Sequence, residues 1–291
     1  MKEKYPIYCI NHYPEQEHGN SQENTFYIIK LSDLVQGFPN IDKPHTHTFY
    51  MFMIVNQGNG KHIIDFVEYP IFPLATFFLT PGQVHSWELS QDIDGYAIFF
   101  EANFFIQQYQ NRLYEYPFFH SNYHTPFLAL EKEATFIQTM IGYQYDCYLD
   151  KIPQKQEILF SFLHIILETL SHRYYQQLPK QVSSHSLSKI RQFENLLNQH
   201  FQDKKEVSEY ADIMHISSNY LNVLCKSNTG KTASQFIQER IITEAKRLLV
   251  HSSLSIKEIA FHLGFEDYAY FSRFFKKHTH TTAENFRKNY E

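Results

Sequence analysis

The spacing of apolar residues near the end of the chain predicts two helices joined by a short turn, between Ser255 and Lys277. Ser255 and Glu258 have the spacing of a capping box, so the first helix should begin there and bury Ile256, Ile259, Ala260 and Leu263. Gly264 ends this helix and Asp267 can cap the next one. The second helix is expected to bury Tyr270, Phe271, Phe274 and Phe275. Its other face is small, polar and basic, as a recognition helix in the major groove of DNA requires.

The same pattern occurs a second time, from Val207 to Lys226. Equivalent positions are offset by 49 residues before the turn and by 50 after it. A single helix predicted for Thr232–Val250 joins the two copies. At about 1.5 Å per residue it spans roughly 28 Å, close to the repeat of one DNA turn, about 34 Å. The repeat therefore favours a domain that reads DNA with two recognition helices.

At these motifs the chain resembles the AraC/XylS family of bacterial transcription regulators, over about Ser186 to Tyr290. The resemblance rests on the segments YLNVLCKSNTG, EAKRLL, SIKEIAFHLGFEDYAYFSRFFKK and NFRKNY. It implies a bi-helix-turn-helix domain that binds two successive major-groove segments of promoter DNA and usually activates transcription. Three positions depart from the family. Val223 stands where a basic residue is frequent, Cys225 where Phe is frequent, and residues 280–283 replace the usual Gly-x-Thr-Pro.

The outward positions of the two recognition helices are the expected DNA contacts: Ser218, Asn219, Asn222, Lys226, Tyr268, Ala269, Ser272, Arg273 and Lys276. Asn can bond adenine and Arg can bond guanine, each worth about 1–3 kcal/mol of discrimination. For Arg273 the alternatives are a phosphate contact or an ion pair with Glu266 or an acid of the linker. Lys231 and Lys277 are expected to contact phosphates.

The first hundred residues carry short apolar runs of strand type, broken by turn signals such as Gly58-Asn59-Gly60 and Pro81-Gly82. Many short strands favour an antiparallel barrel or a double-sheet jelly roll. The segments PHTHTFYMFMIVNQGNG and FFLTPGQVHSWEL, within Lys43–Glu101, resemble the cupin-type sensor domain that often precedes an AraC-type DNA-binding domain.

Cupin enzymes hold a metal with an HxH pair, a Glu and a later His, and by resemblance His45, His47 and His85 stand at the histidine positions. Met51 occupies the position of the Glu, and Met is a poor ligand for hard or borderline divalent ions. No metal and no cofactor are therefore expected, although three His can form an open zinc site. By resemblance, the groups nearest the barrel mouth are expected to bind a small-molecule effector: His45, His47, Tyr50, His85 and Trp87. A sugar suits these groups, and so do aromatic or peptide-like compounds.

Residues 102–177 turn helical, with candidate helices at Glu131–Leu149 and Lys155–Tyr175. The second is apolar on most sides, so it should pack on the barrel and on the same helix of a second subunit. His164 within it is expected to be a satisfied core histidine. We expect a cupin-like effector domain at residues 1–130, a dimerising helical segment at 131–178, a linker at 179–185 and the DNA-binding domain at 186–291.

Charge is distributed unevenly along the chain. The net charge is −5, composed of −8 for residues 1–185 and +3 for residues 186–291. The three cysteines have no metal or redox spacing and are expected to be reduced. The chain begins without the apolar core of a signal peptide and has no apolar run of about 18 residues, so a cytoplasmic location without membrane contact is expected.

Together these features predict an α+β protein: a cupin-like β-barrel or jelly roll, a helical connecting segment and an all-α bi-helix-turn-helix domain. The predicted function is non-enzymatic: an effector-controlled regulator, and by resemblance an activator, with double-stranded promoter DNA, RNA polymerase and a second copy of the chain as partners. Two alternatives stay open. In one the protein is a metal-dependent cupin enzyme with a DNA-binding appendage, and in the other the barrel is only a scaffold.

Overall fold

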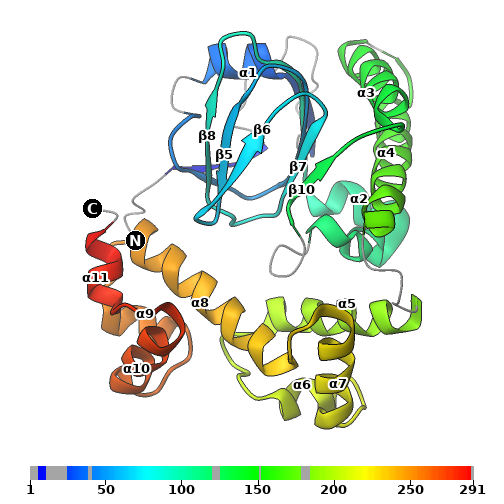
Figure 1. The fold of residues 1–291 in the computed structure, drawn as a ribbon. Helices are drawn as coiled ribbons and strands as arrows, with labels where there is room; N and C mark the ends of the chain where they lie inside the picture. Colours follow the sequence, from blue (N-terminus) through cyan, green and yellow to red (C-terminus); the bar gives the residue numbers. More distant parts are fainter. Residues whose placement is uncertain are drawn as a thin grey trace. The chain divides into compact units, whose positions relative to one another are not determined.

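The computed structural model describes residues 6–10, 25–38, 41–119, 125–150, 152–177 and 184–289, and it divides into two compact units (Figure 1). One unit comprises residues 7–179 and the other residues 180–291 with the first six residues. No helix in the described ranges is both long and apolar enough to cross a membrane. Most of the predicted linker lies outside the described residues, and Ser184, near its end, already begins a helix.

In its described residues, the first unit is built on two antiparallel sheets and a short parallel pair. One sheet has five strands in the order β10-β7-β4-β9-β2, and the other has three in the order β6-β5-β8. The strands are β1 Ile7–Tyr8, β2 Phe26–Lys30, β3 Thr46–His47, β4 Tyr50–Gln57, β5 Gly60–Ile64, β6 Val67–Ile71, β7 Ala75–Leu79, β8 His85–Leu89, β9 Asp94–Phe100 and β10 Phe127–Ala129. This arrangement confirms the predicted β-rich N-terminal fold.

Strand β4 shows how the larger sheet separates two cores. Met51, Met53 and Val55 belong to one buried cluster with side chains of the smaller sheet such as Ile64 and Trp87. Phe52 and Ile54, which alternate with them, belong to a second cluster with the helices. Side chains along a strand point alternately to opposite faces, so β4 contributes to the barrel interior and to the helical layer at once.

A hairpin lies within one of the apolar runs of the first hundred residues. The run His62–Tyr69 has the composition of a single strand, but the chain turns at Asp65 and Phe66, whose φ angles are +46° and +72°. β5 and β6 then pair with Ile64 opposite Val67. Positive φ at both central residues is the geometry of a tight hairpin turn. The sequence has no glycine there, which is why its turn signal is weak.

Helices cover the second face of the larger sheet. They are α2 Ala102–Tyr109, α3 Ala134–Leu149 and α4 Lys155–Gln177, with short 3-10 turns at Gln110–Glu115 and Pro117–Phe119; α1 Leu31–Gly37 follows β2. The two long helices predicted from the sequence are present as α3 and α4, which pack on each other. His164 is half-buried and therefore not the core histidine that was expected, although its Nδ1 lies 3.2 Å from the Tyr116 hydroxyl.

The second unit is all helical within its described residues, as predicted. Its helices are α5 Ser184–His200, α6 Val207–Ile213, α7 Ser218–Thr229, α8 Ala233–His251, α9 Ile256–His262, α10 Tyr268–Thr279 and α11 Ala283–Lys288. Helices α6 and α7 form one helix-turn-helix and α9 and α10 form the other, each packing on α8 (Figure 1).

Candidate functional sites

The two helix-turn-helix copies share their backbone geometry. In the first turn Ile216 N donates to Ala211 O over 3.0 Å, and in the second Phe265 N donates to Ala260 O over 2.9 Å. The residue before each donor has a positive φ, +52° at His215 and +73° at Gly264. The sequence repeat therefore encodes a repeated turn, although only one copy has a glycine at this position.

Side chains cap both recognition helices at equivalent positions. Ser217 Oγ accepts from Tyr220 N over 3.1 Å, and Asp267 Oδ1 accepts from Ala269 N over 2.8 Å. Such caps satisfy backbone N–H groups that have no partner within the helix. Each cap fixes where the helix begins and therefore which side chains point outward.

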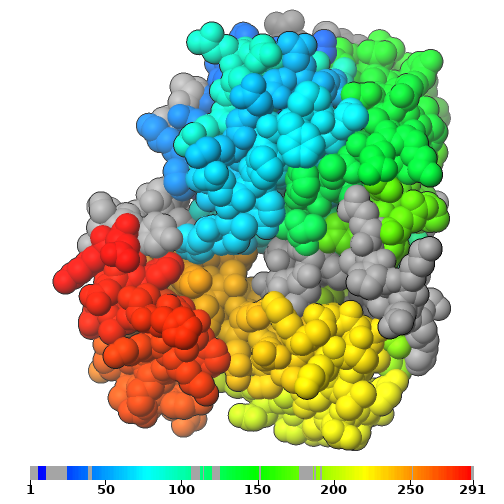
Figure 2. Space-filling model, in the orientation of Figure 1, coloured from blue at the N-terminus to red at the C-terminus, as the bar shows by residue number. Residues whose placement is uncertain are grey.

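The outward faces of α7 and α10 expose the same five helical positions, related by the offset of 50. On α7 they are Asn219, Tyr220, Val223, Lys226 and Ser227, and on α10 they are Ala269, Tyr270, Arg273, Lys276 and Lys277. We call these two sets the outer stripes. The first helix-turn-helix, coloured yellow, and the second, orange to red, both reach the surface shown in Figure 2.

The structure corrects two expectations about these helices. Tyr270 was expected to be buried, with Tyr220 at the matching position, but their side chains are 55% and 42% exposed. Conversely, the predicted contacts Ser218, Asn222, Tyr268 and Ser272 are only half-exposed. The three-and-four spacing leaves the edges of an apolar stripe ambiguous, and large aromatic residues at an edge favour the wrong assignment.

Three of the predicted DNA contacts already have side-chain hydrogen bonds inside the protein, and one of them is the Tyr268 hydroxyl, which donates to Glu284 Oε1 over 3.4 Å. Asn222 Oδ1 accepts a hydrogen bond from Ala233 N over 3.1 Å, which ties α7 to the start of α8. Lys231 Nζ lies 2.8 Å from Glu239 Oε2. Lys231 would have to leave Glu239 to reach DNA, whereas Asn222 can keep the bond to its Oδ1 and still donate from its Nδ2.

Arg273 remains available for a ligand. Its side chain is 70% exposed, and the nearest acidic atom is Asp267 Oδ2 at 3.9 Å, not Glu266. Asp267 is itself 62% exposed and caps α10. An ion pair this open contributes little to stability, so Arg273 can turn toward another anion or an acceptor at small cost.

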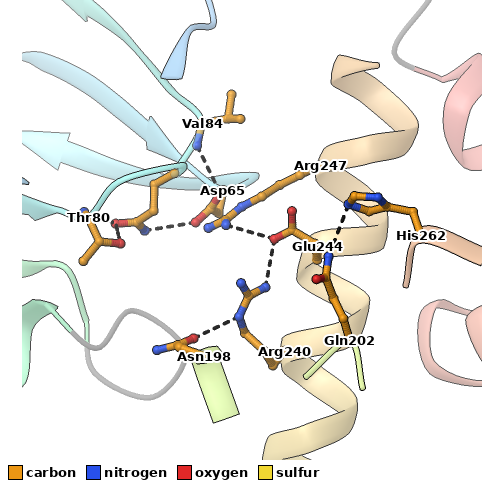
Figure 3. Close-up of polar contacts among 10 residues, drawn as sticks. Asp65, Thr80, Val84, Asn198, Gln202, Arg240, Glu244, Arg247 and His262 are labelled. Carbon is orange, nitrogen blue, oxygen red and sulfur yellow. Dashed lines mark hydrogen bonds and ion pairs between the residues drawn. The ribbon is translucent and has the colours of Figure 1, made fainter. Parts of the chain in front are cut away.

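The basic residues of α8 have a structural role instead. Arg240 donates to Asn198 Oδ1 and to Glu244 Oε2, both over 2.9 Å, and Arg247 donates to Glu244 over 3.4 Å (Figure 3). Their side chains are only 12–13% exposed. Gln202 and His262, 3.2 Å apart, connect the segment before the first helix-turn-helix to the second one. The linker helix thus holds the unit together.

Within the barrel, histidines and a tryptophan form a buried cluster. His45, His47, His85 and Trp87, all predicted to lie together, are joined by His62 of β5, which the sequence analysis missed. The ring centroid of His85 lies 4.2 Å from that of His45 and 5.2 Å from those of His47 and His62. His62 stands opposite Trp87 in the β5–β8 pairing, and its inward direction follows only once that register is known.

Hydrogen bonds set the tautomers of two of these histidines. Nδ1 of His45 lies 2.8 Å from Lys43 O, and Nδ1 of His47 lies 2.7 Å from Phe49 O. A carbonyl oxygen only accepts, so in the neutral rings both Nδ1 atoms carry the proton and both Nε2 atoms are acceptors. Burial, followed by the neighbouring His45, lowers the pKa of both His47 and His62 to about 3. The rings are therefore uncharged at neutral pH.

Several buried polar atoms of this cluster have no hydrogen-bond partner within the described residues: His47 Nε2, His62 Nδ1, His85 Nε2 and Trp87 Nε1. Buried polar atoms are normally paired with protein or ordered water, so these four could bond either ordered water or a polar ligand. No group of three or more His, Cys, Asp or Glu in the described chain has a geometry that could hold a metal ion.

Tyr50 does not belong to this site. Its ring stacks on Phe100 at 5.6 Å and meets Phe119 at 5.1 Å, in the cluster on the helical face of the sheet. Tyr50 precedes Met51, which points into the barrel, and neighbouring residues of a strand face opposite sides. The expectation that Tyr50 lines the effector site with the histidines is wrong for this reason.

Comparison with known proteins gives both units a family. An AraC-like ligand-binding domain model matches residues 34–126, and a helix-turn-helix domain model matches residues 210–289. ToxT of Vibrio cholerae, a solved structure, aligns over 90% of this chain and 97% of its own at 15% identity, with a TM-score of 0.43.

Two relatives with a known role align with most of this chain. The HTH-type transcriptional activator RhaS of Escherichia coli O81 (strain ED1a) is 24% identical over 261 residues, which is 86% of this chain and 89% of RhaS. RhaS of Mannheimia succiniciproducens is also 24% identical, over 80% of this chain and 84% of its own. The chain therefore belongs to the AraC family of transcription regulators, with an AraC-like ligand-binding domain followed by a helix-turn-helix DNA-binding domain.

Proposed function

We propose that this protein activates transcription by binding promoter DNA with both outer stripes, under the control of a small molecule bound in the barrel. The matched exposure of five positions on α7 and on α10 is the observation that carries the proposal. Helix α8, 19 residues long, has a length of roughly 28 Å. That length suits two recognition helices placed in successive major-groove segments.

Activation and assembly are further parts of the proposal. The RhaS relatives are named activators, and we propose contact with RNA polymerase as the means here, in the cytoplasm where promoter DNA lies. We also propose a homodimer formed through the helical segment at residues 131–178. Exposed apolar side chains on α3 and α4, namely Phe136, Tyr143 and Ile165, support that surface.

The effector is proposed to bind at the histidine cluster. His47 Nε2 is a buried acceptor that no described residue donates to, and the surrounding rings are neutral. An uncharged molecule that both donates and accepts hydrogen bonds, such as one bearing sugar hydroxyls, could donate to His47 Nε2 and accept from Trp87 Nε1. We propose a binding role and not an enzymatic one for this site, in line with the relatives, which are regulators.

Arg273 and Lys277 provide the test of DNA reading. Replacing Arg273 by Ala should weaken binding to the preferred site by about 1–3 kcal/mol and relax base preference at one position. Replacing Lys277 by Ala should weaken binding to all sequences about equally. It should also reduce the slope of log K against the logarithm of the salt concentration by about one. Titration of labelled duplexes at several salt concentrations measures both effects.

A cation outside the helix-turn-helix unit is the matched control. Lys61 of β5 pairs with Glu68 at 3.4 Å and lies outside the helix-turn-helix unit. Lys61→Ala changes the net charge of the protein by the same amount as either test variant, and it should leave DNA affinity and its salt dependence unchanged. If Arg273→Ala lost the same factor on every sequence, Arg273 would be a phosphate contact. If neither Arg273→Ala nor Lys277→Ala weakened binding, the proposed interface would be wrong.

A further inference from the structure

The two outer stripes are alike at one aromatic position and unlike at the position that follows one turn later. Tyr220 and Tyr270 occupy the shared position. Val223 on α7 then stands where Arg273 stands on α10. Both residues point outward, since Val223 is 55% exposed and Arg273 is 70% exposed.

Charge separates the stripes as well. The α10 stripe carries three cations, Arg273, Lys276 and Lys277, whereas the α7 stripe carries one, Lys226. Each phosphate contact adds to affinity and to its salt dependence without reading sequence. The α10 stripe can therefore make more contacts with DNA phosphates than the α7 stripe. Most α7 side chains are uncharged and can make only hydrogen bonds or van der Waals contacts.

The difference between Val223 and Arg273 predicts that the two helices prefer different bases. An outward arginine bonds the O6 and N7 atoms of guanine, whereas an outward aliphatic side chain can only meet an apolar group, and in the major groove that group is the C5 methyl of thymine. Val223 has the polar Asn219 one turn before it and Lys226 three residues after it, so it lies within a surface suited to base edges and phosphates.

We propose that the two recognition helices read different bases: Val223, beside Tyr220, reads a thymine methyl, and Arg273, beside Tyr270, reads a guanine. The operator then consists of two unlike blocks, a thymine-containing one under α7 and a guanine-containing one under α10. This inference rests on the proposed function, because it requires both stripes to face DNA.

Replacing thymine by uracil removes only the methyl group and tests the contact. In a site selected by the wild-type protein from random duplexes, uracil at one thymine of the first block should weaken wild-type binding about threefold to fivefold. The same change should have a clearly smaller effect on the Val223→Ala variant, because alanine has less apolar surface to place against the methyl group. Replacement of a thymine by uracil in the guanine-containing block is the matched control. It should change the affinities of the wild type and of Val223→Ala by the same factor.

A gain of preference gives a second and independent test. Val223→Arg makes the α7 stripe resemble the α10 stripe at this position, and the exposed side chain leaves the core unchanged. Selection with this variant should enrich guanine in the first block, and guanine there should now improve binding at least about fivefold. Helical circular dichroism equal to that of the wild type verifies the fold.

The outcomes separate this inference from the proposed function. Two unlike blocks with a uracil effect that is reduced in Val223→Ala would support both. A selected two-block site in which no thymine shows a uracil effect, or in which Val223→Ala keeps the full effect, would overturn the inference alone. A pool with no enriched motif would overturn the proposed function and the inference with it.

Discussion

Gly264→Ala is expected to unfold the helical unit or to destabilise it by about 3–5 kcal/mol. Gly264 has a φ of +73° in the turn between α9 and α10. A Cβ atom built there overlaps the backbone oxygen of Gln202 and lies 2.7 Å from Lys205 Nζ. The lysine end can move, but the Gln202 oxygen belongs to backbone held between α5 and α6. Steric overlap therefore adds to the conformational cost of about 1–2 kcal/mol for a non-glycine residue in this region.

Gly230→Ala is the matched control for that prediction. Gly230 ends α7 with a φ of +77°, and a Cβ atom there meets nothing within 4 Å. Gly230→Ala should lower the free energy of unfolding by only the cost of the left-handed backbone conformation, about 1–2 kcal/mol. Far-UV circular dichroism follows the helices, while fluorescence of Trp87, the single tryptophan, follows the barrel. Equal losses for the two variants would show that the contact with Gln202 has no energetic effect.

Acid is expected to destabilise the barrel well before its carboxylates titrate. Burial holds the pKa of His47 and of His62 at about 3, against an ordinary value of 6.5. Above pH 6.5 these histidines are neutral whether the chain is folded or unfolded, so they do not alter stability. As pH falls from 6.5 toward 3 the unfolded chain takes up the protons and the folded barrel does not. Each histidine then removes about 2 kcal/mol of stability between pH 7 and pH 5.

Urea unfolding followed by Trp87 fluorescence at pH 7 and pH 5 measures this loss. His62→Gln removes one of the titrating rings and should reduce the pH-dependent loss by about 2 kcal/mol. His85, whose pKa burial also lowers, should behave in the same way. A barrel equally stable at both pH values would contradict the assignment of these rings as buried and neutral.

Much of the helical unit could be predicted from the sequence because its signals are local. Caps such as Ser255 and Asp267 and the apolar spacing act within a few residues of one another, and the repeat shows the same local pattern a second time. What local spacing could not decide was the edge of each stripe. The ring centroids of Tyr270 and Phe265 are 5.7 Å apart, yet Tyr270 is 55% exposed. An apolar residue at the edge of a stripe can therefore belong to the buried face or to the exposed face.

The barrel was predictable in class but not in its site. Period-two alternation separates the faces of a strand, yet it does not say which face is the interior until the sheets are assembled. For this reason Tyr50 was assigned to the wrong side. His62 was missed because the HxH pattern draws attention to His45 and His47, whereas His62 reaches the cluster from a third strand through strand register.

Selection of bound sites from a random duplex pool, at physiological salt and with the full-length protein, tests the central claim most directly. Two enriched blocks whose centres lie about one helical turn apart, roughly 10 base pairs, are predicted because α7 and α10 carry matching outer stripes. A single enriched block would mean that only one helix reads bases. If no sequence were enriched, either without added ligand or with any compound that stabilises the barrel, the claim that this protein reads DNA through both stripes would be contradicted.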